Sequence, residues 1–124
     1  DWGYKHRYVE EPFEYAALVL TRIISIVSDT LITTDLGYKA VASENPLPRV
    51  HFLNAPQANP LSQSEEHLSL QVPDSSCFKI GDVLYGVPVH ICPTVALYDK
   101  AFVVEKGEVI DSWKVIARDR VINF

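Results

Sequence analysis

The sequence predicts an all-β fold, either a compact barrel or a sandwich of short strands. Three observations support this prediction. Apolar runs are short and recur at nearly regular spacing along the chain. Turn-forming residues, including eight prolines and five glycines, separate these runs. Few segments repeat apolar residues at the three-to-four-residue spacing of a helix. Short strands interrupted by turn residues are typical of all-β barrels and sandwiches.

Composition and charge limit the class of protein. A length of 124 residues fits one domain that buries roughly two-thirds of its unfolded surface. Eleven basic residues against sixteen acidic ones give a formal net charge of −5, which does not suit a nucleic acid or an anionic membrane as partner. No apolar stretch is long enough to span a bilayer, and no signal peptide is visible at Asp1. We therefore expect a cytoplasmic location.

Residues 1–12 are predicted to be a lead-in, and residues 13–124 a single β-domain. The first eight residues are polar and aromatic without a clean period, which indicates an irregular arm. Because the chain does not begin with Met, we expect a fragment or a processed product.

The longest apolar segment is Phe13–Val27. Its many β-branched residues favour a long strand that is buried on both faces, although Ala16–Leu20 also permit a helix. A second strand over Thr30–Leu36 is predicted to pair with it as a hairpin. Gly37 is then expected to take a positive φ where the chain turns.

The middle of the chain is predicted to be rich in loops. Residues 45–60 carry four prolines around a short strand at Val50–Leu53. His67–Val72 alternates apolar and polar residues, which predicts a strand with one buried face. A turn at Lys79–Asp82 leads into an apolar strand over Val83–Val87.

The C-terminal third is predicted to contain three further strands. Two of them, Val95–Tyr98 and Ala101–Val104, flank Asp99 and Lys100. The segment Glu105–Glu108 contains a glycine and predicts a tight hairpin loop. The last strand is expected over Val109–Ala117, with Trp113 as a core or rim anchor.

The candidate metal site is the His-x-Cys sequence that follows the Val83–Val87 strand. If the strand continues, His90 and Cys92 present an imidazole and a thiol on the same side. Both are ligands that zinc prefers, and two protein ligands leave coordination positions open, as in catalytic sites. The alternative is a hydrogen-bonded histidine beside a small apolar cysteine. We expect both cysteines, Cys77 and Cys92, to be free thiols in a reducing compartment.

A second group of candidate residues precedes the His67–Val72 strand. Glu66 and His67 could serve as general base or as partner of a metal ligand. Adjacent residues of a strand point to opposite faces, so we do not expect them to share one role. They are also the only obvious suppliers of the third ligand and the base that a stand-alone zinc hydrolase would need.

Several motifs in order resemble one enzyme family. The sequence Pro88-x-His90-x-Cys92-Pro93-Thr94 resembles the metal motif in the C-terminal domain of the D-threonine aldolase and D-serine dehydratase family. These enzymes use pyridoxal phosphate (PLP) and have an alanine-racemase-like fold. The resemblance extends from about Pro12 onward and includes four further blocks, namely Ala17–Ser25, Asp35–Ala40, Ser64–His67 and Trp113–Arg118.

The resemblance implies a function for the domain. A metal on His90 and Cys92, zinc or alternatively manganese, would polarise the β-hydroxyl of a D-amino-acid substrate. Glu66 and His67 would face the active site. The chemistry implied is that of an aldolase or a dehydratase. An alternative is a non-catalytic β-module for oligomerisation or partner binding, with the motif unmetallated.

The resemblance also implies a missing half. In the family, PLP is held by a lysine in an Arg-Pro-His-x-Lys segment of an N-terminal (β/α)₈ barrel. That segment does not occur in this sequence, and Lys39 does not stand in such a segment. We therefore expect PLP only in a missing barrel domain, and the isolated chain to be inactive. An open sheet edge also leads us to expect a homodimer.

Overall fold

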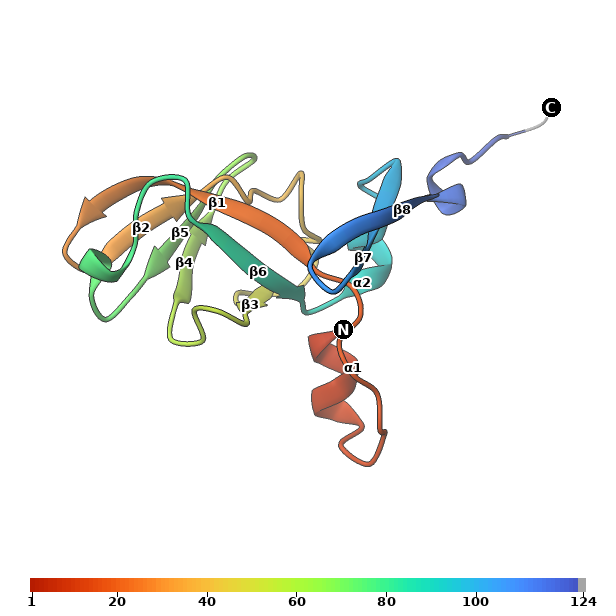
Figure 1. Cartoon of the computed structure of the whole chain (residues 1–124), viewed down its shortest axis with the longest axis horizontal. Coiled ribbons are helices and arrows are strands. Elements are labelled where there is room, and N and C mark those ends of the chain that lie inside the picture. The colour runs from red at the N-terminus through yellow and green to blue at the C-terminus, as the bar shows by residue number, and fades with distance from the viewer. Residues whose placement is uncertain (123–124) are drawn as a thin grey trace.

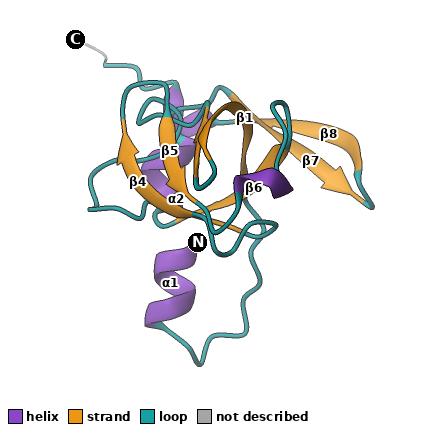
Figure 2. Cartoon of the chain, turned by 90° about the vertical axis from the view of Figure 1, so that its left-hand side faces the viewer, coloured by secondary structure: helices purple, strands orange, loops and turns teal. Residues whose placement is uncertain are grey.

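The computed structural model describes residues 1–122 and has eight strands, two short α-helices and two short 3₁₀ helices (Figure 1). Six strands form one sheet in the order β3-β6-β1-β2-β5-β4, and it curls into a nearly closed barrel (Figure 2). The all-β prediction is confirmed. The strands of this sheet are β1 (Val19–Ser28), β2 (Leu31–Thr34), β3 (Val50–Phe52), β4 (Asn59–Gln63), β5 (Leu68–Gln71) and β6 (Val83–Pro88).

Strand β1 begins later than predicted and is buried on one face only. Val19, Thr21 and Ile23 point into the core, whereas Leu20 between them is 63 % exposed. The strand starts at Val19 because pairing with β6 starts there, at Gly86. The prediction of a strand from Phe13, buried on both faces, is wrong. The predicted hairpin of β1 with β2 is confirmed.

The core lies inside the curled sheet. Burying a large aliphatic side chain of this kind stabilises the fold by about 1.5–3 kcal/mol. The most deeply buried large side chains come from β1, β2, β5, β6 and the turn after β2, and they are Ile23, Ile32, Leu36, Leu68, Leu70 and Leu84.

One strand was not predicted. β4 has the sequence Asn-Pro-Leu-Ser-Gln and lies at the edge of the sheet, paired only with β5. An edge strand tolerates a proline that a central strand would not. Because of this proline, the sequence of β4 indicates a loop. The short strand β3 and the strand β5 confirm two predictions within one or two residues.

Gly37 is required for a different reason from the one predicted. Its φ is not positive; the glycines with positive φ are Gly81 and Gly107. Instead, a Cβ at position 37 would lie 1.9 Å from the carbonyl oxygen of Glu65. The turn after β2 packs backbone to backbone against the segment before β5, and only glycine permits that approach.

The N-terminal segment is a helix and not the irregular arm predicted. In α1 (Trp2–Arg7), the Asp1 side chain caps the helix by accepting a hydrogen bond from Tyr4 N at 2.8 Å. The Trp2 ring is stacked between the rings of His6 and His51, with centroids 3.7 and 3.6 Å away. Burial there, and secondarily the nearby His6, lower the pKa of His51. These contacts dock α1 on the edge strand β3.

The C-terminal part combines a helix and a hairpin. The short helix α2 (Ile91–Val95) and a turn replace the strand predicted over Val95–Tyr98. The hairpin of β7 (Lys100–Glu105) with β8 (Glu108–Lys114) confirms the predicted loop, in which Gly107 has a φ of 85°. A 3₁₀ turn follows at Ile116–Arg118, and the other 3₁₀ turn is Ser75–Cys77.

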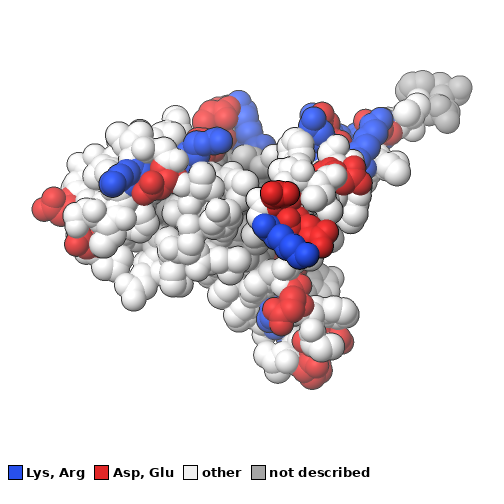
Figure 3. Space-filling view, in the orientation of Figure 1, with Lys and Arg blue, Asp and Glu red and all other residues white. Residues whose placement is uncertain are grey.

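The β7–β8 hairpin forms a sheet of its own, to the right of the six-stranded sheet in Figure 1. Every residue of β8 is exposed. Trp113 is 65 % exposed, so within the described chain it does not anchor a core. Charged side chains gather near the hairpin, α2 and α1, and are sparse over the middle of the sheet on the face shown in Figure 3.

Two further expectations concern membranes and cysteines. No helix among residues 1–122 is long and apolar enough to cross a membrane. Cys77 and Cys92 are both free thiols, as expected, and both are exposed.

Candidate metal centre

The His-x-Cys motif lies at a strand-to-helix junction. β6 ends at Pro88, and His90 is the residue that precedes α2, with φ −133° and ψ 108°. Cys92 is the second residue of the helix, and Pro93 is tolerated because the first helical turn needs no backbone donor. The prediction that His90 and Cys92 alternate along one strand is therefore wrong. Both residues remain accessible at the start of α2.

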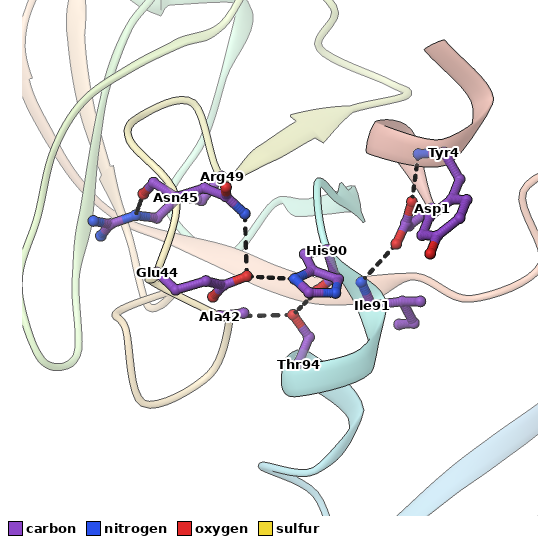
Figure 4. A network of polar contacts seen from close by, with 9 residues as sticks. All are labelled: Asp1, Tyr4, Ala42, Glu44, Asn45, Arg49, His90, Ile91 and Thr94. Carbon is purple, nitrogen blue, oxygen red and sulfur yellow. Dashed lines mark hydrogen bonds and ion pairs between the residues drawn. The ribbon is translucent and has the colours of Figure 1, made fainter. Parts of the chain in front are cut away.

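His90 is held by a residue that the sequence did not suggest. The Nδ1 atom of His90 lies 2.5 Å from Oε1 of Glu44, and the two side chains are 39 % and 45 % exposed (Figure 4). Asn45 Nδ2 donates to the same oxygen at 3.1 Å. Burial alone would raise the pKa of Glu44, but hydrogen bonds from its own backbone N–H and from His90 lower it overall. The interaction leaves Nε2 of His90 as the nitrogen available to a ligand.

A buried threonine connects the loop that carries Glu44 to the motif. Thr94 is 1 % exposed. Its hydroxyl donates to the carbonyl oxygen of His90 at 2.7 Å and accepts from Ala42 N at 3.1 Å. These hydrogen bonds fix the loop to the start of α2 at Ala42, two residues before Glu44.

A third distant segment completes the junction. Asp1 accepts a hydrogen bond from Ile91 N at 2.9 Å, while His90, which occupies the N-cap position, makes no side-chain cap. Gly3 N donates to Val89 O at 3.0 Å. The N-terminal segment therefore caps α2 and holds the backbone on either side of His90.

Replacing Thr94 by valine is expected to destabilise the domain by about 2–3 kcal/mol. Valine keeps the shape, but the buried Ala42 N–H and the His90 carbonyl lose their partner. Urea unfolding followed by circular dichroism measures the effect, with Thr33→Val in the half-buried strand β2 as control. Equal unfolding midpoints for the two variants would contradict the connecting role of Thr94.

The second group of predicted residues lies in a different environment. Glu66 and His67 stand in the turn before β5, and both are exposed. Glu66 and Glu65 pair with Lys39 at 2.8 and 2.9 Å, and the hydrogen bond to Glu66, followed by that to Glu65, raises the pKa of Lys39. Within residues 1–122, no hydrogen bond or ion pair joins this group to His90.

Asp35, in the block that resembles the family, has a defined structural role. Its carboxylate accepts from the Thr21 hydroxyl at 2.5 Å and from Arg22 N at 2.7 Å. The Asp35 carboxylate therefore connects β1 and β2 at the end of the hairpin opposite its turn.

Few side chains of the described residues are placed to bind a metal ion together. Among the described residues, no group of three or more His, Cys, Asp or Glu side chains is placed to hold an ion. A histidine whose Nδ1 faces a carboxylate does, however, have the arrangement typical of metal-ligating histidines. At this junction the side chains with donor atoms suited to a metal are His90, 39 % exposed, and the exposed thiol of Cys92.

A comparison with known protein families identifies the family of this chain. The family described as "Putative serine dehydratase domain" matches residues 16–104. The chain belongs to this family.

Two curated relatives of this chain differ in how much of their length it covers. A D-threonine aldolase from an Arthrobacter species is 31 % identical over 107 residues, which cover 86 % of this chain and 28 % of the aldolase. An uncharacterized protein of Mycobacterium tuberculosis is 32 % identical over 93 residues, which cover 72 % of this chain and 70 % of that protein. The chain thus spans about a quarter of the aldolase but most of the mycobacterial protein.

Solved structures confirm the predicted fold. The crystal structure of D-threonine aldolase from Filomicrobium marinum superposes with a TM-score of 0.79 at 27 % identity, covering 87 % of this chain and 29 % of that one. An alanine-racemase-like protein from Idiomarina loihiensis shares the fold at a TM-score of 0.66 and 21 % identity, covering 80 % of this chain and 31 % of that one. Both the fold class and the family resemblance inferred from sequence are therefore confirmed.

Proposed function

We propose that this chain is the metal-binding C-terminal domain of a PLP-dependent lyase that acts on β-hydroxy D-amino acids, of the D-threonine aldolase or D-serine dehydratase type. The observation that carries the proposal is the His90–Glu44 pair beside Cys92 at the start of α2. Membership of the family and the similarity to D-threonine aldolase support it.

The residues of this chain have separate roles in the proposal. Nε2 of His90 and the Cys92 thiolate hold a divalent ion, zinc or alternatively manganese. When bound, that ion supplies Lewis-acid polarisation of the substrate hydroxyl. Glu66, which pairs with Lys39, and His67 are proposed as acid–base or orienting residues on the active-site side, each with its own role.

The proposed enzyme needs a second domain for PLP. The curated aldolase is several times longer than this chain, and the PLP-lysine segment of the family does not occur here. Lys39 is occupied by two glutamates. We propose that an N-terminal barrel domain carries PLP and that residues 1–12 lead in from it.

The exposed hairpin offers a surface for that domain. A two-stranded hairpin is marginally stable alone in water, yet the β7–β8 hairpin is exposed throughout its second strand. It presents several large apolar side chains, namely Phe102, Val104, Val109, Ile110 and Trp113. We propose that the barrel domain covers this surface, and that the complete enzyme is a cytoplasmic homodimer.

Metal titration of the isolated domain tests the proposal. The unaltered domain is expected to bind Zn²⁺ more tightly than Mn²⁺, because a thiolate suits the softer ion. Cys92→Asp should shift the preference toward Mn²⁺ by about tenfold or more, because a carboxylate is a hard ligand. Affinity should fall on acidification, since both protein ligands bind metal in their deprotonated forms. Competition with a chromophoric chelator at two pH values measures both effects.

The chain supplies a matched control. Cys77→Asp makes the same chemical change at another exposed free thiol, in the 3₁₀ turn Ser75–Cys77. If Cys92→Asp and Cys77→Asp have the same metal preference as the unaltered domain, then His90 and Cys92 are not the site.

A second candidate is a non-catalytic β-module for oligomerisation or partner binding. The exposed apolar hairpin favours it, together with the small donor set in the described residues. Metal analysis of the purified chain separates the two functions, because a module with an unmetallated motif does not retain a stoichiometric ion.

A further inference from the structure

The contact between Glu44 and His90 fixes the protonation pattern of the imidazole. An ionised carboxylate only accepts hydrogen bonds, and the pair is 2.5 Å apart at Nδ1. A neutral His90 must therefore carry its proton on Nδ1 and keep the lone pair on Nε2. The carboxylate selects one of the two tautomers that a free imidazole side chain can adopt.

Glu44 is itself held in place from two sides. On one side, Asn45 donates to its Oε1, and Arg49 Nε donates to the Asn45 carbonyl at 2.6 Å. Arg49 reaches on to Gln63 of β4 at 2.8 Å. On the other side, the Ala42 amide donates to Thr94 of α2 (Figure 4). The loop that carries the carboxylate is thus anchored to the sheet and to the helix that follows His90.

A purely structural role accounts poorly for this arrangement. Both side chains are partly exposed to water, and an ion pair in contact with solvent adds little to stability. The loop and helix are already joined by the buried Thr94. The Glu44–His90 contact is therefore better explained by what it does to the imidazole than by what it adds to the fold.

We propose that Glu44 is the positioning residue of the metal motif: it holds the proton on Nδ1 of His90 and directs Nε2 outward as the ligating nitrogen. This inference rests on the proposed metal-binding function. It assigns a role to Glu44, which lies 46 positions from His90 in the sequence. Glu44 acts on the metal through that histidine. Partners of this kind typically change metal affinity by about 10–100-fold.

The first test uses the metal-free domain. Long-range proton–nitrogen NMR near pH 8.5 reports which ring nitrogen carries the proton, and the His90→Ala variant assigns the His90 signals among the four histidines. The unaltered domain is expected to show the Nδ1–H form. Glu44→Ala should shift His90 toward the Nε2–H form, while Glu44→Gln, whose amide oxygen still accepts, should retain the Nδ1–H form.

The second test measures Zn²⁺ affinity by chelator competition. Glu44→Ala should weaken binding by about 10–100-fold, and Glu44→Gln should recover part of that loss. The control is Glu14→Ala, which also removes one exposed carboxylate and one ion pair, in this case with Lys5. It should leave both the tautomer and the affinity unchanged.

The outcomes separate this inference from the proposed function. An unchanged His90 tautomer in Glu44→Ala, or zinc affinity equal to that of the Glu14→Ala control, overturns the role of Glu44. If the unaltered domain binds no zinc but its tautomer depends on Glu44, the positioning of His90 stands and the metal function of the isolated domain fails.

Discussion

Gly37→Ala is expected to destabilise the domain by at least about 3 kcal/mol, at the upper end of what overpacking costs. The added methyl group would lie 1.9 Å from Glu65 O, 2.1 Å from Glu65 C and 2.2 Å from Glu66 N. These are backbone atoms, so no side chain can rotate away to relieve the clash. The turn after β2 would have to separate from this segment, breaking the hydrogen bonds of Tyr38 N and Lys39 N to Ser64 O and Glu65 O. Urea unfolding measures the loss.

The control for this variant is another glycine. Gly107 has a φ of 85° with open space around its Cβ position, so Gly107→Ala should cost only about 1 kcal/mol from backbone strain. If Gly37→Ala costs no more than Gly107→Ala, the close backbone approach at Gly37 does not limit stability.

Under the proposed function, His90→Ala is expected to lower the lyase activity of the complete protein by about a thousandfold or more, because Lewis-acid stabilisation is worth several kcal/mol. The domain should stay folded, since the imidazole is partly exposed and contributes no buried apolar contact to the core. Steady-state kinetics of the complete enzyme and the melting temperature of the isolated domain give the two readouts.

The comparison variant is His6→Ala, which removes another exposed imidazole, one that stacks on Trp2 and has no contact with His90 among the described residues. It should leave activity nearly unchanged. Full activity in His90→Ala would remove the histidine from the proposed chemistry. A collapsed fold would show that His90 is structural.

Much of the fold could be predicted from local patterns. The β1–β2 and β7–β8 hairpins follow from β-branched runs separated by turn residues, and β5 follows from strict alternation. The errors have physical causes. β4 contains a proline that only its edge position tolerates, and α1 is a six-residue helix stabilised by the cap of Asp1 and by the stacking of Trp2 on His51 of β3.

The candidate site could be predicted only in part. The motif identified His90 and Cys92, but continuing the strand through them was wrong because backbone bonding toward β3 stops at Val89 and the helix α2 begins at Ile91. Glu44 stands in a polar stretch before Pro46 that reads as an ordinary loop. Only the folded topology brings it to His90, so no local pattern could identify it.

The junction at His90 also has a consequence for folding. It joins residues 46, 52 and 90 positions apart in the chain, through Glu44–His90, Ala42–Thr94 and Asp1–Ile91. Contacts of such long sequence separation form slowly, because the intervening loops must first close. The proposed ligands His90 and Cys92 are close in sequence, but the contacts that position His90 are absent from the unfolded polypeptide. An ion that binds only the assembled junction would therefore stabilise the entire domain by mass action, and thermal unfolding of any of the three segments would release it.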